Sequence, residues 1–498
     1  MKIREFFKWI FMTTRKKLII NLLLAGVVTG GGGCKKFLST LPDNRAVITT
    51  PEQTSLLLTS AYPHSSYMLF CEAMSDNAED KGNSPLGVDP NSFQINIEAF
   101  KYQDELSTTG YDLPITYFDS CYHAIAVANQ ALVYCNNADS NNYSAQKGEA
   151  LLCRAYAHFM LATLFAKSYN PATAATDPGV PYITTVETQV FGTYDRKTVQ
   201  YDYDMIENDL VRGLSLIQDA SYGSAPKFHF TLQAAHAFAA RFYLFKQDYA
   251  QVVSHASLVF GSSDPSTLIR DQVTEYGTKQ YNQIAIDYTL STESANILLQ
   301  EGDSYWPTYY YQYRYGYGQN LNVQLFSPGQ NVTGGTYAVI TYGSTPQFFN
   351  FPKFVNSGYA SFTSNAVFPL LSMEEVLMNR AEAYARLQNY PAALADLNAW
   401  VSKNIKEYGT TIGDLTNSSL TSYYGQSLQA SLIDAALDFK RVSYFQEGLR
   451  WFDILRLNIP VQHTSTDGFS STLVADDDRR LLQFPLQAAQ EGVPLNPR

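Results

Sequence analysis

Aromatic side chains crowd one short segment of the chain, residues 304–320. Its sequence, SYWPTYYYQYRYGYGQN, supplies the candidate binding residues Trp306, Tyr309, Tyr310, Tyr311 and Tyr313. A tyrosine ring has an apolar face and a hydroxyl at its edge, which suits a wet binding surface. The segment is therefore a candidate ligand-binding surface. The alternation of tyrosines up to Tyr317 would also arise in a strand whose aromatic face packs on helices.

Sequence patterns typical of catalysis or metal binding are missing. The seven histidines fall in no HExxH pattern, no GxSxG elbow occurs, and the five cysteines form no CxxC pair. Asp476-Asp477-Asp478 lacks the spaced ligands and the glycine of a calcium loop, and we interpret it as a solvated acidic turn. We expect no catalytic residue, no metal site and no cofactor, and we leave a structural calcium ion open.

Cys34 follows a segment that is typical of an export signal. Positive charges lie between Lys2 and Lys17, and the apolar run Leu18–Val28 is far shorter than the ~20 residues of a spanning helix. The small residues Thr29–Gly33 stand directly before the cysteine, as in a substrate of lipoprotein signal peptidase. We predict a signal peptide over residues 1–33 and lipidation of Cys34, whose acyl chains would hold the protein on a membrane. An ordinary secretory signal, an uncleaved anchor and a start at Met12 are the alternatives.

The composition excludes some classes of partner. Hydrophobic residues make up 45% of the chain and charged residues 16%, as in a globular protein. The formal net charge is −11, which gives no electrostatic footprint for nucleic acid and no basic face for anionic lipid. Four cysteines besides Cys34 remain, and those in helix-like stretches are expected to be buried free thiols.

Helical periodicity dominates two regions and predicts a mostly α fold. Apolar side chains recur at three- and four-residue steps over residues 146–167, and residues 115–135 form another helical stretch, so we expect an antiparallel pair. A second pair begins near Leu371 and turns at Asn389-Tyr390-Pro391. Its small and aromatic residues have the spacing of a tetratricopeptide repeat. A looser copy of this spacing follows Ala240.

Residues 261–370 differ from these helices. They are rich in Tyr, Gly, Ser, Thr and Asn and have little helical period. Long irregular segments in a helical chain are usually functional. We expect one domain over residues 34–498, in which a helical scaffold (about 115–260 and 371–456) carries a loop-rich insert (about 261–370) as the binding face.

Several motifs together resemble one family. They are Cys34-Lys35-Lys36-Phe37-Leu38, Ser75-Asp76-Asn77-Ala78, GEALLCRAYAHFMLATLF, the helix pair at 371–401, FQEGLRWFDILR and the ending FPLQAAQEGVPLNPR. In this combination the chain resembles the SusD/RagB family of outer-membrane nutrient-binding lipoproteins of Bacteroidota. In the EGxRWFDxxR signature we interpret Trp451 and Phe452 as packed helix residues. Glu447, Arg450, Asp453 and Arg456 lie three or four residues apart, at salt-bridging steps along a helix, and are expected to brace the fold rather than bind ligand.

The resemblance implies a function. It implies a SusD-like fold and non-catalytic capture of oligosaccharide at the cell surface, with delivery to a TonB-dependent SusC-like barrel in the outer membrane. It also implies that the loop Tyr62–Asp80 lies near the ligand, which adds Tyr67, Asp76 and Asn77 to the candidate glycan-binding residues, although turn roles suit the last two. A tetratricopeptide-type scaffold that binds a peptide or protein, and an exported glycoside hydrolase, are the alternative functions.

Overall fold

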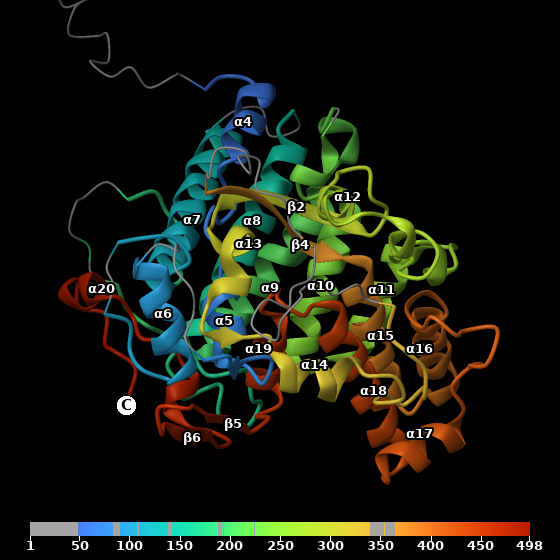
Figure 1. The fold of residues 1–498 in the computed structure, drawn as a ribbon. Coiled ribbons are helices and arrows are strands. Elements are labelled where there is room, and N and C mark those ends of the chain that lie inside the picture. Colours follow the sequence, from blue (N-terminus) through green and yellow to red (C-terminus); the bar gives the residue numbers. More distant parts are fainter. Residues whose placement is uncertain are drawn as a thin grey trace, which may run out of the picture. The chain divides into compact units, whose positions relative to one another are not determined.

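The computed structural model describes residues 48–82, 90–106, 109–137, 142–187, 192, 194–223, 225–338, 353 and 364–498 (Figure 1). The described elements belong to one compact unit, Thr49–Arg498. The predicted signal peptide (residues 1–33) and the predicted lipidation site Cys34 lie outside the described residues.

Most described residues are helical. The α-helices are Pro51–Leu58 (α4), Met68–Met74 (α5), Pro90–Phe100 (α6), Pro114–Asn137 (α7), Ser144–Phe165 (α8), Val199–Leu216 (α9), Leu232–Lys246 (α10), Tyr249–Phe260 (α11), Tyr281–Tyr288 (α12), Trp306–Tyr309 (α13), Gln319–Phe326 (α14), Met373–Arg386 (α15), Tyr390–Asn404 (α16), Asn417–Tyr424 (α17), Leu428–Ser443 (α18), Leu449–Arg456 (α19) and Leu486–Gln490 (α20). The strands are Glu79–Asp80 (β1), Asn296–Asp303 (β2), Tyr315–Gly316 (β3), Asn365–Ser372 (β4), Val461–Thr464 (β5) and Ser470–Leu473 (β6), and they pair antiparallel as β1–β3, β2–β4 and β5–β6. This architecture confirms the predicted fold class.

The helices α7, α8 and α9 form the first part of the scaffold. α7 and α8 lie side by side, which confirms the predicted helix pair, and α9 packs on the other side of α8. Two glycines allow the backbones of α8 and α9 to approach closely. A Cβ atom on Gly213 would lie 2.7 Å from Leu152 Cγ, and one on Gly148 would lie 2.7 Å from the backbone nitrogen of Ile217. Side chains at these positions would force the two helices apart.

The second part consists of two helix pairs, α10–α11 and α15–α16, which lie where the sequence has tetratricopeptide-like spacing. In the latter pair, Pro391 lies in the first turn of α16, where it has no hydrogen bond to lose, and Ala381 and Ala393 are buried where the helices meet. α11 packs on α15, and α18 packs on both α15 and α16. The repeat-like helices therefore use their faces largely to pack on one another.

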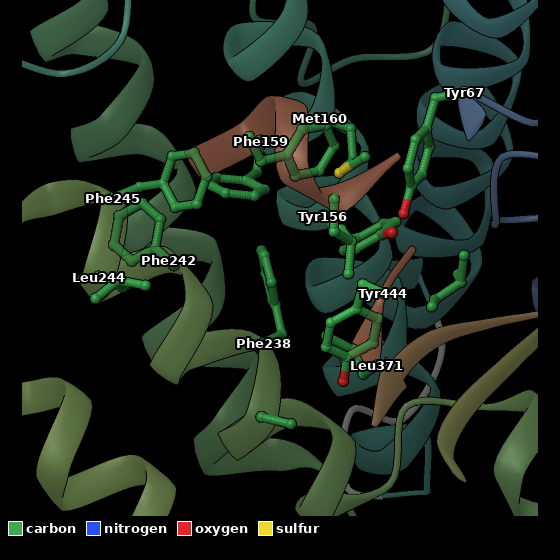
Figure 2. Close-up of a cluster of buried hydrophobic side chains, with 14 of the residues drawn as sticks. Tyr67, Tyr156, Phe159, Met160, Phe238, Phe242, Leu244, Phe245, Leu371 and Tyr444 are labelled. Carbon is green, nitrogen blue, oxygen red and sulfur yellow. The ribbon is translucent and has the colours of Figure 1, made fainter. Parts of the chain in front are cut away.

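Aromatic rings fill the core between α8 and α10. Figure 2 shows side chains of the two helices pointing toward one another, among them Phe159, Phe238 and Phe245. The ring of Phe159 lies edge-on to Phe238 and Phe245, with centroids 5.6 and 5.1 Å apart. Edge-to-face geometry of this kind is the favoured arrangement of aromatic pairs. Many of the aromatic residues therefore stabilise the fold.

The segment of residues 304–317 is not the strand that the alternating tyrosines suggested. Trp306–Tyr309 forms a helical turn, Tyr310–Gln312 forms a turn of 3₁₀-helix, and only Tyr315–Gly316 is strand. Pro307 in the first turn favours the helix because its fixed φ angle suits that position. The alternation in sequence therefore does not correspond to alternation across a sheet.

Four cysteines of the described chain, Cys71, Cys121, Cys135 and Cys153, are buried free thiols, which confirms that expectation for the three in the helix-like stretches. No helix in the described part of the chain is both long enough and apolar enough to cross a membrane.

Candidate functional site

The helical turn α13 is held in place at its N-terminus. It follows β2, and the backbone nitrogen of Ser304 donates a hydrogen bond of 2.7 Å to the carbonyl of Ser364 just before β4. The buried carboxylate of Asp112 accepts hydrogen bonds from the Ser304 hydroxyl and, at 2.8 Å, from the backbone nitrogen of Tyr305. A carboxylate at a helix N-terminus is favourable because it accepts from amide groups that have no partner within the helix. The side chains of α13 are therefore attached to a rigid support.

Three of the predicted ligand-binding rings point into the protein. Trp306, Tyr310 and Tyr313 are at most 3% exposed. The indole nitrogen of Trp306 donates a hydrogen bond of 2.8 Å to the carbonyl of Gln446, and its ring stacks on Tyr313 with centroids 5.5 Å apart. These rings pack in the core, as the alternative interpretation of the segment expected. Their faces are covered by protein in this structure.

Other rings of the same segment lie at the surface. Tyr305, Tyr309 and Tyr311 are half-buried, and Tyr111, which comes from a distant part of the chain, is 36% exposed. Tyr305 lies edge-on to Tyr111 with centroids 5.1 Å apart and is 5.9 Å from Tyr309. We call Tyr111, Tyr305 and Tyr309 the tyrosine cluster. Sequence reasoning named Tyr309 but missed the other two. Tyr305 stood inside the predicted segment, whereas no local signal marked Tyr111.

Polar side chains lie beside the tyrosine cluster, where β2 and β4 meet α13. Glu301 and Asp303 are exposed near the end of β2. Asn365 donates to the Glu301 carboxylate from its side-chain amide, and the hydroxyl of Ser364 donates a bond of 2.6 Å to Asp303. These groups supply hydrogen-bond donors and acceptors at the end of the β2–β4 pair that leads into α13.

The loop candidates Tyr67, Asp76 and Asn77 are tied to the protein interior. Tyr67 is 4% exposed, and its ring lies 5.2 Å from that of Phe452. The buried amide of Asn77 accepts a bond of 2.7 Å from Arg441. Asp76 accepts two bonds, of 2.8 and 2.9 Å, from the guanidinium of Arg450. Asp76 and Asn77 form a turn, as one of the two interpretations of these residues predicted. Arg441 and Arg450 hold this turn by hydrogen bonds.

The electrostatics of Asp76 agree with this structural role. Burial alone would raise the pKa of its carboxyl, but Arg450 and Arg441 beside it lower that pKa to about 2. The carboxylate therefore keeps its charge at neutral pH and stays paired.

Most charged residues of the signature form ion pairs with residues of other elements. Of the ion pairs predicted along the helix, only one is present. Lys353 pairs with Glu447 at 2.8 Å, Arg450 with Asp76, Lys440 on α18 with Asp453 at 3.1 Å, and Arg456 with Glu382 on α15 at 2.9 Å. Only Arg456 and Asp453, 2.8 Å apart, pair within α19. The reason is that α19 is buried nearly all round, so its charges need partners on the elements that cover it. The signature charges therefore stabilise the fold mainly by joining different elements, and less by ion pairs along a single helix.

A buried glutamate that sequence reasoning missed joins this network. Glu72 on α5 accepts hydrogen bonds from the backbone nitrogens of Gln446 (2.7 Å) and Gly448 (3.0 Å), directly before α19. Burial raises the pKa of Glu72 to about 7, although these two hydrogen bonds act to lower it. A charged residue in the otherwise apolar helix MLFCEAM was the available signal.

The acidic turn is engaged by protein groups. Asp477 pairs with Arg479 at 2.6 Å, and Asp476 accepts a bond of 3.1 Å from Asn458. Among the residues that the structure describes, no group of three or more His, Cys, Asp and Glu side chains is placed to hold a metal ion.

Comparison with known proteins finds similarity to SusD-like proteins. Residues 36–244 match a SusD-like family model described as "Starch-binding associating with outer membrane". The fold matches a SusD superfamily protein from Bacteroides vulgatus (TM-score 0.68, 16% identity, 90% of this chain and 99% of that chain) and one from Bacteroides thetaiotaomicron (0.66, 16%, 90% and 100%). It also matches a SusD-like carbohydrate binding protein from Bacteroides vulgatus (0.63, 14%, 89% and 97%). No curated protein matches the chain.

The chain therefore has a SusD-like fold, and the family-model match over residues 36–244 agrees with the predicted family. The family model is described as starch-binding and associated with the outer membrane, and one of the three similar structures is a carbohydrate binding protein.

Proposed function

We propose that this protein captures oligosaccharides at the cell surface without transforming them and passes them to a TonB-dependent SusC-like barrel. A lipid on Cys34 would hold it on the outer membrane. The observation that carries the proposal is the tyrosine cluster, three rings partly open to solvent that lie at the two ends of α13 (Tyr305 and Tyr309) and before α7 (Tyr111). The family match supports the same class of ligand.

The cluster suits a sugar for a physical reason. The axial C–H face of a pyranose is apolar, so a tyrosine ring covers it without breaking the hydrogen bonds of the hydroxyls at its edge. Three rings from two segments can contact more than one sugar unit, which favours an oligosaccharide over a monosaccharide. Glu301, Asp303 and Asn365 at the adjoining end of the β2–β4 pair are candidate hydrogen-bond partners for sugar hydroxyls. Tyr311, also half-buried, is a further candidate contact.

The test is a glycan panel with matched variants. The lipid-free chain would be screened by calorimetry against plant, host and microbial oligosaccharides, followed by Tyr305→Ala and Tyr309→Ala. We expect each variant to lose about tenfold in affinity, since stacking of a ring on its ligand contributes about 1–1.5 kcal/mol. Tyr201→Ala, which removes a 40% exposed ring on α9, is the control and should bind as the natural protein does. Absence of binding across the panel would contradict the proposal.

The same panel, extended with peptides, separates the alternatives. Shorter products after incubation would show a glycoside hydrolase. Binding of peptides with no binding of glycans would favour a tetratricopeptide-type scaffold. The packing of α18 and α11 against α15 and α16 argues against that scaffold, because these faces are already covered.

A further inference from the structure

A cavity that shares no lining residue with the tyrosine cluster has an unusual lining. Its volume is about 230 Å³, and it lies between α7, the segment 181–187 and the C-terminal segment 485–493 around α20. The side chains of Phe118, Tyr122, Ile125, Ile183 and Val493 supply its apolar lining. We call it the acidic pocket because of the charges that accompany these side chains.

Three carboxylates line the acidic pocket: Asp119 on α7, Glu187, and Glu491 after α20. No lysine or arginine is among the described lining residues. Within the part of the chain that the structure describes, no cation forms an ion pair with any of the three. The hydroxyl of Tyr194 hydrogen-bonds to Glu187, and the pKa of Tyr194 is raised to about 12 mainly for that reason. The pocket thus combines an apolar interior with uncompensated negative charge.

Arg196, which contacts the C-terminal segment, is hydrogen-bonded to other groups. Arg196 lies over the ring of Phe484, 4.4 Å from its centroid. Its guanidinium donates hydrogen bonds to the carbonyl oxygens of Gly179 and Pro494, both at 2.7 Å, and to Asn496. Arg196 is therefore occupied in fixing the C-terminal segment, which forms one wall of the pocket.

We infer that the acidic pocket receives a lysine or arginine side chain of a partner protein. Such a side chain places its apolar stem along the pocket walls and its charged head among the carboxylates. The size supports this occupant, because the cavity is smaller than the roughly 300–1,000 Å³ of typical small-molecule sites. Leu486, beside the lining residue Pro485, is 67% exposed, so an apolar side chain of such a partner would find an apolar contact next to the pocket.

The inference is independent of glycan binding, and two probes test it. The first is the peptide acetyl-Gly-Leu-Arg-Leu-Gly-amide, compared by calorimetry at low ionic strength with the same peptide carrying Gln in place of Arg. The second is benzamidinium, compared with neutral benzamide. We expect the Arg peptide to bind at least tenfold more tightly than the Gln peptide and more tightly than benzamidinium, because the flanking leucines add apolar contact.

Variants locate the binding. Ala126→Phe places a ring on the exposed face of α7 that lines the pocket and should abolish binding of the Arg peptide. Glu187→Gln and Asp119→Asn should each weaken it about three- to tenfold. The controls are Ala250→Phe and Asp204→Asn, which alter exposed positions on α11 and α9 and should leave binding unchanged.

The other outcomes overturn the inference. Equal affinity for the Arg and Gln peptides would show that the carboxylates select no cation. Benzamidinium binding as tightly as the Arg peptide would show a small-cation site rather than a protein contact. Full binding by a folded Ala126→Phe variant, with an unchanged melting temperature, would place the peptide elsewhere.

Discussion

At the scale of single residues, two neighbours in sequence have opposite roles. Tyr305 is half-buried and belongs to the tyrosine cluster, whereas Trp306 is 1% exposed and donates a hydrogen bond to Gln446. Both are aromatic, and composition alone does not separate them. The helical turn of α13 separates them, because consecutive side chains of a helix point in different directions.

This difference predicts separable mutational effects. Tyr305→Ala should weaken glycan binding and change the free energy of unfolding little, since surface substitutions usually cost within about 0.5 kcal/mol. Trp306→Ala should lower the free energy of unfolding by about 3–5 kcal/mol because it leaves a cavity and an unpaired carbonyl. Urea denaturation of both variants measures this. Equal losses of stability would contradict the assignment of Tyr305 to the surface.

Glu72 predicts a pH dependence of stability. Its pKa is about 7 in the folded protein, above the ordinary value of 4.5, so the folded state binds a proton more tightly than the unfolded state does. Its contribution to stability is complete below about pH 4.5 and is lost as the pH rises to about 7. The opposite effect of Asp76, whose folded pKa is about 2, is confined to lower pH.

The measurement compares the natural protein with Glu72→Gln. Urea midpoints between pH 5 and 8 should fall with rising pH in the natural protein and fall less steeply in the variant. Other buried acids, such as Asp202 with a pKa of about 7, contribute equally to both proteins and cancel in the difference. Parallel curves would show that Glu72 does not titrate in this range.

At the scale of elements, the start of α19 is constrained by Gly448. Its φ angle is +76°, and a Cβ atom there would lie 3.0 Å from Cys71 Cβ and 3.1 Å from Met68 Cα on α5. Gly425 at the end of α17 has a similar φ of +67° but nothing within 4 Å of an added Cβ. The two glycines thus share a left-handed backbone conformation and differ in the space around an added Cβ atom.

We expect Gly425→Ala to lower the free energy of unfolding by about 1 kcal/mol, the cost of a left-handed non-glycine residue. Gly448→Ala should cost at least about 2 kcal/mol, because α5 and α19 must also separate. Thermal and urea denaturation of the two variants provide the comparison. A loss at Gly448 no larger than at Gly425 would show that the contact with α5 adjusts freely.

Helices were predictable from sequence where apolar residues recur at helical spacing over several turns. The pairs α7–α8 and α15–α16 follow from apolar spacing and from turn residues such as Pro391. The helical turn α13 was not predictable, since four residues carry no period and the tyrosine alternation favours a strand. The ion-pair partners of the signature arginines were not predictable either. Arg450 pairs with Asp76 and Arg456 with Glu382, and each partner lies far away in sequence. The same distance explains why Tyr111 was missed.

At the scale of the whole molecule, the proposed anchor gives a prediction about location. Expressed with its full N-terminal segment in a bacterium that processes lipoproteins, the protein should fractionate with the outer membrane. Cys34→Ala should move it to a soluble fraction, because the acyl chains that hold it have no attachment point. Immunoblots of the separated fractions measure this. Equal membrane retention of the variant would favour an uncleaved anchor.

The burial of the four thiols has a practical consequence. Burial raises the pKa of Cys71, Cys121 and Cys153, and that of Cys135 to about 11, so these thiols carry almost no reactive thiolate at neutral pH. In a chain that begins after Cys34, a cysteine introduced at an exposed position such as Leu486→Cys becomes the preferred target of a maleimide dye. A fluorophore at that position sits beside the acidic pocket and would report the arrival of a partner by a change in emission. In this chain the four buried thiols compete little with the introduced cysteine for the dye, so the label reaches a single site.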